Sequence, residues 1–222
     1  MEEMSNNSSS QLKAEGMNIR VLMAFGVVAI LFTLLGFGLG KGQSIAPGED
    51  SPDAGFARDM MMHHAQAVDM ATLLRDRTED PEMRQLALDI MLTQQAQIGQ
   101  MQGWLAVWQY PIASTDLSMS WMGMPGPMPG MATPEQLNQL RSLKGLEADG
   151  LFLQLMIPHH RGGVQMAEAA LINAKASQVL ILAQSILDAQ TSEIELMQAM
   201  LQEKGFSPMP EENGVGHNNM NP

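Results

Sequence analysis

Apolar residues recur every three or four positions over most of the chain beyond residue 53, which is the period of an amphipathic α-helix. Phe56, Met60 and Ala67 fall on one such face. We expect long helices over four ranges and a shorter helix over a fifth: 53–77, 81–108, 146–174 and 176–204, with the short one over 133–144. No stretch shows the alternation that is typical of β-strands. The pattern therefore predicts an all-α domain.

An internal repeat organises this domain. Residues 53–71, DAGFARDMMMHHAQAVDMA, recur as residues 149–167, DGLFLQLMIPHHRGGVQMA, at a constant offset of 96 (149 minus 53). The offset persists downstream and implies duplication of a helical hairpin, with repeats over 53–108 and 146–204. Two hairpins with one apolar stripe each bury those stripes best against each other. We therefore expect a four-helix bundle over 53–204 with an approximate two-fold axis, followed by a flexible tail over 205–222.

A different apolar pattern lies near the N terminus. Residues 21–39 carry no charge and are bounded by Arg20 and Lys41. At about 1.5 Å per residue, such a helix just spans a hydrocarbon core of about 30 Å. We expect a polar leader over 1–20, an uncleaved transmembrane signal-anchor over 21–40 and a linker over 41–52. A cleaved secretory signal and a buried globular helix are the alternatives. The first interpretation predicts a single-pass protein of the cell membrane whose soluble domain is extracytoplasmic, in the periplasm or at the cell exterior.

The amino-acid composition limits the partners and the metal ligands that the chain can use. The chain has 12 Lys and Arg against 24 Asp and Glu, which argues against a nucleic-acid partner. It has no Cys, so a metal would need His, Met, carboxylate or amide ligands. The 22 Met residues beside 5 His are unusual, because Met is both a core filler and a soft thioether ligand.

Four of the five His residues form two doublets within the repeated motif M-x2-HH-x5-M. On a helix, Met156, His159 and Met166 share one stripe, which Asp149 extends; the first repeat offers the same spacing from Asp53. If the two repeats pack together, four imidazoles and four thioethers converge. Imidazole accepts copper or zinc and thioether prefers Cu(I), so the mixed set indicates copper. The candidate ligands are His63, His64, His159, His160, Met60, Met70, Met156 and Met166.

Polar residues on the partner helices are candidates for orienting these imidazoles by hydrogen bonds. They are Gln94, Gln97, Gln190 and Glu193. The alternative is that they are ordinary polar residues at helix surfaces or between helices.

The segment between the repeats, a Met-rich loop over 109–132, contains SMSWMGMPGPMPGM. Its prolines exclude a regular helix, because proline lacks a backbone donor. We expect a flexible array that gathers three thioethers around Cu(I), the alternative being a linker in which Met is incidental. Its five Met residues are Met119, Met122, Met124, Met128 and Met131. His217 and Met220 in the tail are a weaker addition.

The sequences FARDMMMHHAQAVDMA, MPGM and FLQLMIPHHRGGVQMAEAA, with the pattern from Gln190 to Met197, resemble the domain of unknown function 305 family. This family includes CopM-like bacterial copper-binding proteins. The resemblance covers about 53–204 and implies an extracytoplasmic helical protein in the four-helix style of ferritins. It implies copper bound by the eight His and Met residues of the doublet motifs, with a role in copper resistance or trafficking. The chain departs from the pattern at Met62 and Pro158, and Gln97 stands where the second repeat has Glu193.

We therefore expect a non-enzymatic protein that sequesters or transfers copper, with Cu(I) favoured and Cu(II) possible. Its expected partners are copper ions, the membrane and a copper-transfer protein. One alternative is a metal-free envelope scaffold or partner-binding bundle. A ferritin-like di-iron enzyme is less favoured, because such sites use Glu-x-x-His motifs and no Glu here has a His three residues later.

Overall fold

The computed structural model describes residues 46–209, which form helices and loops without strands. Four helices are long: α2 (Pro52–Arg75), α3 (Pro81–Trp108), α5 (Gly145–Asn173) and α6 (Ser177–Glu203). A shorter helix, α4 (Pro134–Ser142), and one 3-10 turn, η1 (Ser120–Met122), lie between α3 and α5. The all-α prediction is confirmed for the described range.

The polar leader, the signal-anchor and the first part of the predicted linker, residues 41–45, lie outside the described residues, as does the tail from residue 210. Within 46–209, no helix combines the length and the hydropathy needed to cross a bilayer.

The helix starts follow from local sequence. The Ser51 side chain accepts from the Ala54 backbone N–H, and Asp80 accepts from two backbone N–H groups at the start of α3. Thr133 and Gln136 form a reciprocal capping box at the start of α4. In each case proline follows the cap, where its missing N–H costs nothing. The α5 helix also contains Pro158 and runs on through it without a break.

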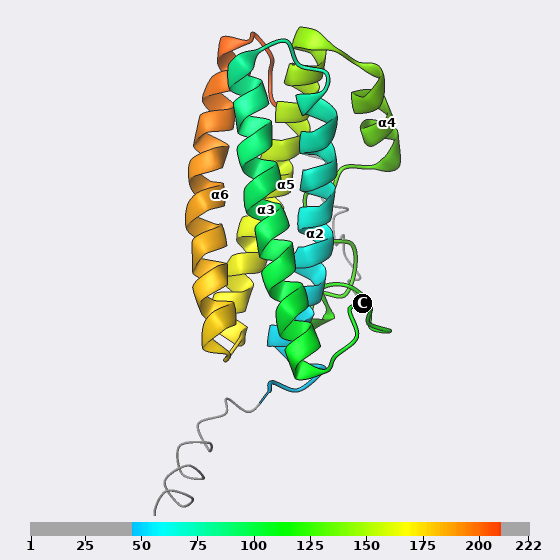
Figure 1. The fold of residues 1–222 in the computed structure, drawn as a ribbon, viewed down its shortest axis with the longest axis vertical. Helices are drawn as coiled ribbons and strands as arrows, with labels where there is room; N and C mark the ends of the chain where they lie inside the picture. Colours follow the sequence, from blue (N-terminus) through cyan, green and yellow to red (C-terminus); the bar gives the residue numbers. More distant parts are fainter. Residues whose placement is uncertain (1–45, 210–222) are drawn as a thin grey trace, which may run out of the picture. The chain divides into compact units, whose positions relative to one another are not determined.

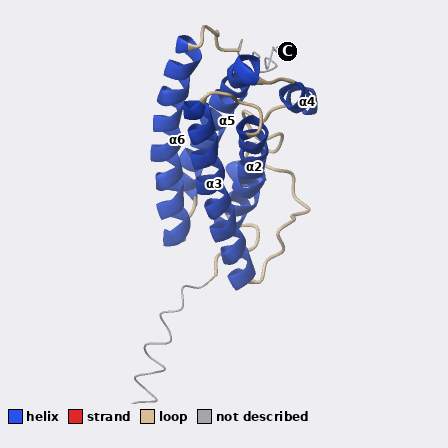
Figure 2. Ribbon diagram, turned by 45° about the horizontal axis from the view of Figure 1, so that its top comes forward, coloured by secondary structure: helices blue, strands red, loops and turns tan. Residues whose placement is uncertain are grey.

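The long helices form two antiparallel hairpins, α2 with α3 and α5 with α6, that pack mainly through α2 and α5 (Figure 1). The α3 helix ends at the opposite end of the bundle from the start of α5, so the intervening loop runs along the bundle beside α2 (Figure 2). The α4 helix lies to one side of the upper half of Figure 1. In this crossover topology α2 and α5 run antiparallel, which brings the two repeats face to face.

The core consists of two apolar clusters. One lies toward α4 and includes Phe152 and Leu140, and the other lies toward the opposite end and includes Phe56 and Leu105. Each long helix contributes buried polar residues between its contributions to the two clusters. They are His63 and His64 on α2, Gln94 and Gln97 on α3, His159 and His160 on α5, and Gln190 on α6. A polar layer therefore crosses the bundle between the two apolar clusters.

Candidate metal centre

The four imidazoles of the doublets are fully buried, and we call His63, His64, His159 and His160 the imidazole layer. His63 on α2 stacks on His159 of α5, with ring centroids 3.8 Å apart and planes inclined by 33°. Within the doublets the centroids are 6.5 Å apart on α2 and 6.3 Å apart on α5. The rings thus form a chain of neighbours that starts at His64, crosses the contact between α2 and α5, and ends at His160.

Each end of the layer is anchored to the second helix of its hairpin. The Nε2 atom of His64 lies 2.7 Å from Gln97 Oε1 on α3, and the Nε2 atom of His160 lies 2.7 Å from Glu193 Oε2 on α6. Because these oxygens accept, each Nε2–H donates and the rings are fixed in orientation. Of the four side chains that the sequence singles out for this role, these two contact an imidazole. The amides of Gln94 and Gln190 are buried without a hydrogen-bond partner.

The opposite nitrogens of the rings have no partner. The Nδ1 atoms of all four imidazoles are buried without a hydrogen bond, and so is His159 Nε2. A buried polar atom without a hydrogen-bond partner lowers the free energy of unfolding by about 1–3 kcal/mol. Five such nitrogens in one layer therefore call for a physical reason. In an imidazole whose Nε2–H donates, Nδ1 carries a lone pair, which is the form that binds metals. The donors present therefore fit a metal that accepts imidazole nitrogen.

Burial also sets the charge of the layer. Loss of solvation lowers the pKa of His63 to about 4 and, helped by the neighbouring His63, that of His64 to about 3. Burial lowers the pKa of His159 well below its ordinary value, and the surrounding imidazoles lower it further. These rings are neutral at neutral pH, so no proton occupies the nitrogens that a metal would need.

Thioethers flank the layer on both sides. Met60 and Met166 belong to one apolar cluster, Met70 and Met156 belong to the other, and all four side chains are fully buried. Because α2 and α5 run antiparallel, the Met that precedes the doublet on one helix lies in the same cluster as the Met that follows the doublet on the other helix. The eight predicted residues are thus all buried, with the imidazoles in the layer and two Met residues in the apolar cluster on each side of it. Within 46–209, no three His, Cys, Asp or Glu side chains come together at metal-binding spacing.

The repeated aspartates are buried, as expected of positions that extend the stripe, but they contact groups at the ends of the bundle rather than the imidazole layer. Asp53 accepts hydrogen bonds from the backbone of Lys175 and Ala176, at 3.0 and 2.7 Å, and so holds the turn between α5 and α6. Asp149 pairs with Lys204 at 3.5 Å, near the opposite end of the bundle. Seven residues of helix separate each aspartate from the nearest Met of its motif, a distance of about 10 Å along the axis. Each aspartate therefore lies near a helix end, where it stabilises the neighbouring segment.

The Met-rich loop is held against α2, which differs from the flexible array that the sequence predicts. The Asp59 carboxylate accepts from the Met119 backbone N–H at 2.7 Å and from Trp121 Nε1 at 2.8 Å. Further along α2, the Gln66 amide forms two hydrogen bonds with the backbone of Ala132, at 2.9 and 2.7 Å. The sequence interpretation missed both α2 residues. One available signal was that Asp59 occupies a core-facing position where the second repeat has Leu155.

The five loop Met residues do not converge. Met119 is buried, and Met122 and Met128 pack against the cluster that contains Met60. Met124 is 62% exposed, and Met131 faces a separate cavity. The loop therefore has thioethers at the surface and thioethers next to the core, rather than three around one point.

The loop reaches the imidazole layer at Pro129, whose carbonyl oxygen lies 3.1 Å from His63 Nε2. Two glycines permit this approach. A Cβ atom on Gly162 of α5 would lie 2.1 Å from the Pro129 oxygen, and one on Gly130, where φ is +74°, would lie 2.1 Å from the Pro158 oxygen. Loop and helix backbones are thus in direct contact over the doublet of α5.

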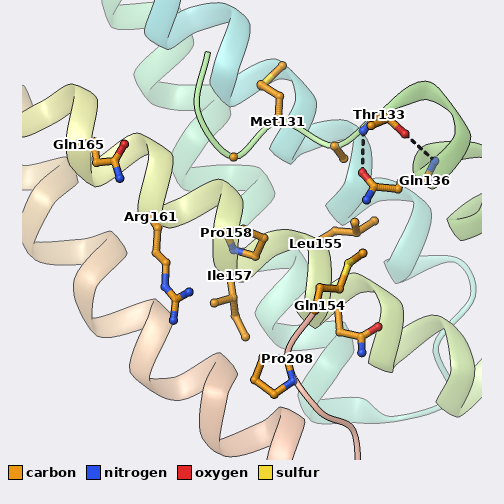
Figure 3. A pocket seen from close by; sticks show the side chains of 13 residues that line it. Met131, Thr133, Gln136, Gln154, Leu155, Ile157, Pro158, Arg161, Gln165 and Pro208 are labelled. Carbon is orange, nitrogen blue, oxygen red and sulfur yellow. Dashed lines mark hydrogen bonds between the residues drawn. The ribbon is translucent and has the colours of Figure 1, made fainter. Parts of the chain in front are cut away.

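A cavity of about 500 Å³ borders this contact, because Gly130 and Pro158 both line it. Its lining includes Met131 of the loop, Gln154, Pro158 and Arg161 of α5, and Pro208 (Figure 3). Pro158 of the lining directly precedes His159 in the sequence, and the two His residues of the doublet do not line the cavity.

Comparison with known proteins places this architecture in a family. Residues 53–201 match the family described as Domain of unknown function (DUF305). The crystal structure of a DUF305 protein from Streptomyces coelicolor, described as a candidate secreted protein, is 48% identical with a TM-score of 0.71. That match covers 72% of this chain and 98% of the other.

CopM is a second structural relative. In its Cu(I)-bound form it is 28% identical with a TM-score of 0.52, and in its Cu(II)-bound form it is 28% identical with a TM-score of 0.55. Each match covers 68% of this chain and 96% of CopM.

A curated relative, uncharacterized protein L153 of Acanthamoeba polyphaga mimivirus, is 39% identical over 49 residues, or 22% of this chain. The chain spans about a third (32%) of that relative's length. The family match extends from the start of α2 to the last turns of α6, and the chain therefore belongs to the DUF305 family.

Proposed function

We propose that this protein is an extracytoplasmic, membrane-anchored copper-binding protein that takes copper as cargo, for sequestration, resistance or trafficking, and is not an enzyme. The observation that carries the proposal is the set of buried, unpartnered Nδ1 atoms between two pairs of buried thioethers. Membrane attachment rests on the apolar sequence over 21–39, which lies outside the described residues.

The donor set suits copper better than other common metals. Neutral imidazole binds Cu(I), Cu(II) and zinc, whereas thioether strongly favours Cu(I). The relative CopM has been solved with Cu(I), Cu(II) and silver, and silver is likewise a soft monovalent cation. In this chain the imidazole layer would supply nitrogen, and Met60, Met70, Met156 and Met166 would supply sulfur.

The Met-rich loop would serve the exchange of copper. Met124 is exposed to solvent, and Met128 lies next to the Pro129 carbonyl that contacts His63. A loop with thioethers on both its outer and its inner side offers soft ligands along the way from solvent to the core. The recipient would be a copper-transfer protein.

The test is a titration of the purified full chain with Cu(I) against a competing chelator. The key variant replaces Met60, Met70, Met156 and Met166 with Leu, which removes sulfur while conserving core volume. We expect Cu(I) affinity to fall by more than about 100-fold, because loss of direct ligands exceeds the 10–100-fold typical of groups that only orient ligands.

A matched control replaces Met83 and Met200, which are buried in the core outside the repeated motif. This double Leu variant should keep the affinity of the original chain. If the original chain binds no stoichiometric Cu(I), the metal-free scaffold is the better description. Iron-dependent consumption of oxygen would instead favour the di-iron enzyme.

A further inference from the structure

The two ends of the imidazole layer match in sequence and geometry but differ in charge. Gln97 and Glu193 occupy equivalent positions of the repeat, and each places an oxygen 2.7 Å from an imidazole Nε2. Both oxygens accept the same hydrogen bond, so both can hold the ring in the same tautomer. The two side chains differ in exposure and in the negative charge of the carboxylate.

This difference bears on the oxidation state of bound copper. A carboxylate behind a ligating imidazole makes that imidazole a more basic ligand. Its charge also attracts the ion in proportion to the ion's own charge, so Cu(II) gains more than Cu(I). The Glu193 side chain is 24% exposed, and solvent weakens this attraction without removing it.

The α3 end has the opposite properties. Gln97 is neutral and only 8% exposed, a position where an unpaired carboxylate would be costly to bury. Because the partner of His64 is a neutral amide, Cu(II) lacks at this end the advantage that the carboxylate gives, and thioether ligands favour Cu(I).

We propose that Glu193 is a positioning residue that makes the α6 end of the imidazole layer select Cu(II), whereas Gln97 leaves the α3 end to Cu(I). This inference rests on the proposed copper function. It assigns the two halves of a duplicated site to different oxidation states of one metal.

The experiment uses three variants of the full chain, Glu193→Gln, Gln97→Glu and the double swap. Each is titrated with Cu(II) and, separately, with Cu(I), against competing chelators. We expect Glu193→Gln to weaken Cu(II) binding by about 10–100-fold and Cu(I) binding several-fold less. Gln97→Glu should strengthen Cu(II) binding relative to Cu(I), and the double swap should restore the original preference.

A readout on the metal-free protein separates charge from orientation. The nitrogen NMR shifts of His160 should report an Nε2–H tautomer in both the original chain and Glu193→Gln, because an amide oxygen still accepts. Glu193→Leu, which has no acceptor, should lose that tautomer.

The outcomes are distinct. If the original chain binds neither ion, the proposed function itself fails. If it binds copper but Glu193→Gln weakens Cu(I) and Cu(II) equally, Glu193 only supports the ring and the inference is overturned. If Glu193→Gln does not fold, Gln97→Glu decides: a rise in the preference for Cu(II) supports the inference, and no rise overturns it.

Discussion

At the scale of single residues, His159 is the least satisfied side chain of the imidazole layer. Neither of its ring nitrogens has a hydrogen-bond partner, although the side chain is fully buried. Replacing it with Leu, which is apolar and of similar size, should raise the free energy of unfolding of the metal-free protein by about 1–2 kcal/mol. The same variant should bind copper more weakly. Urea denaturation with and without Cu(I) measures both effects.

His160→Leu is the matched control, because it removes a ring whose Nε2–H is satisfied by Glu193. It should stabilise the metal-free protein less than His159→Leu does. A His159→Leu variant that is less stable than the original chain would mean that the ring has a structural role that its contacts do not reveal.

At the scale of elements, the contact between the Met-rich loop and α5 depends on the absence of a side chain at Gly162. A Cβ there would meet the backbone oxygen of Pro129, which no side-chain rotation can relieve. Gly162→Ala should therefore displace the loop and separate Pro129 from His63, at a cost of about 1–3 kcal/mol in the free energy of unfolding. The ring nitrogen NMR shifts of His63 would report the lost hydrogen bond.

Gly99→Ala is the control for this substitution. Gly99 also lies within a long helix, but a Cβ there would meet nothing within 4 Å. Ala is the better helix former, so this variant should gain about 0.5–1 kcal/mol. Equal effects of the two substitutions would show that loop contact at Gly162 contributes nothing.

The helices and their pairing could be predicted from the sequence because their causes are local or repeated. The 3.6-residue period and the prolines after Ser51, Asp80 and Thr133 mark the helices, and a repeat at constant offset predicts that equivalent positions meet. The path of the Met-rich loop could not be predicted. It depends on contacts such as Asp59 with Trp121, 62 positions apart, whose partners no period or motif connects.

The arrangement of the candidate site could be predicted only in part. The doublets occupy equivalent positions of the two repeats, so the sequence predicts that their imidazoles lie side by side. The roles of Asp53 and Asp149 did not follow, because helical spacing gives the face of a residue but not its partner at the end of the bundle. Asp53 reaches backbone groups more than 120 positions away.

At the scale of the whole molecule, the buried imidazoles make stability depend on pH. In the folded protein the pKa of His63 is about 4 and that of His64 is about 3, whereas in the unfolded chain both are near 6.5. Below pH 6.5 the unfolded chain therefore binds more protons than the folded protein. The stabilisation is complete above pH 6.5 and declines as pH falls toward the folded values, by about 1.4 kcal/mol per pH unit for each imidazole.

Urea midpoints measured on metal-free protein between pH 7.5 and 5 would test this dependence. The window stays above the range in which ordinary carboxylates protonate. Replacing both His63 and His64 with Leu should reduce the slope, and replacing His217 should not. A flat profile in the original chain would contradict the burial of neutral rings.

The two apolar clusters of the bundle are joined through a layer of imidazoles that have ring nitrogens without hydrogen-bond partners. Most of the buried side-chain polar atoms that lack a hydrogen-bond partner within 46–209 lie halfway along the helices, while Asp53 and Asp149 contact groups at helix ends. A copper ion bound at the imidazole layer would give those nitrogens the partners that they lack in the metal-free protein. On the proposed copper function, occupancy would stiffen the middle of the bundle, and a recipient could then distinguish a loaded molecule from an empty one by its rigidity.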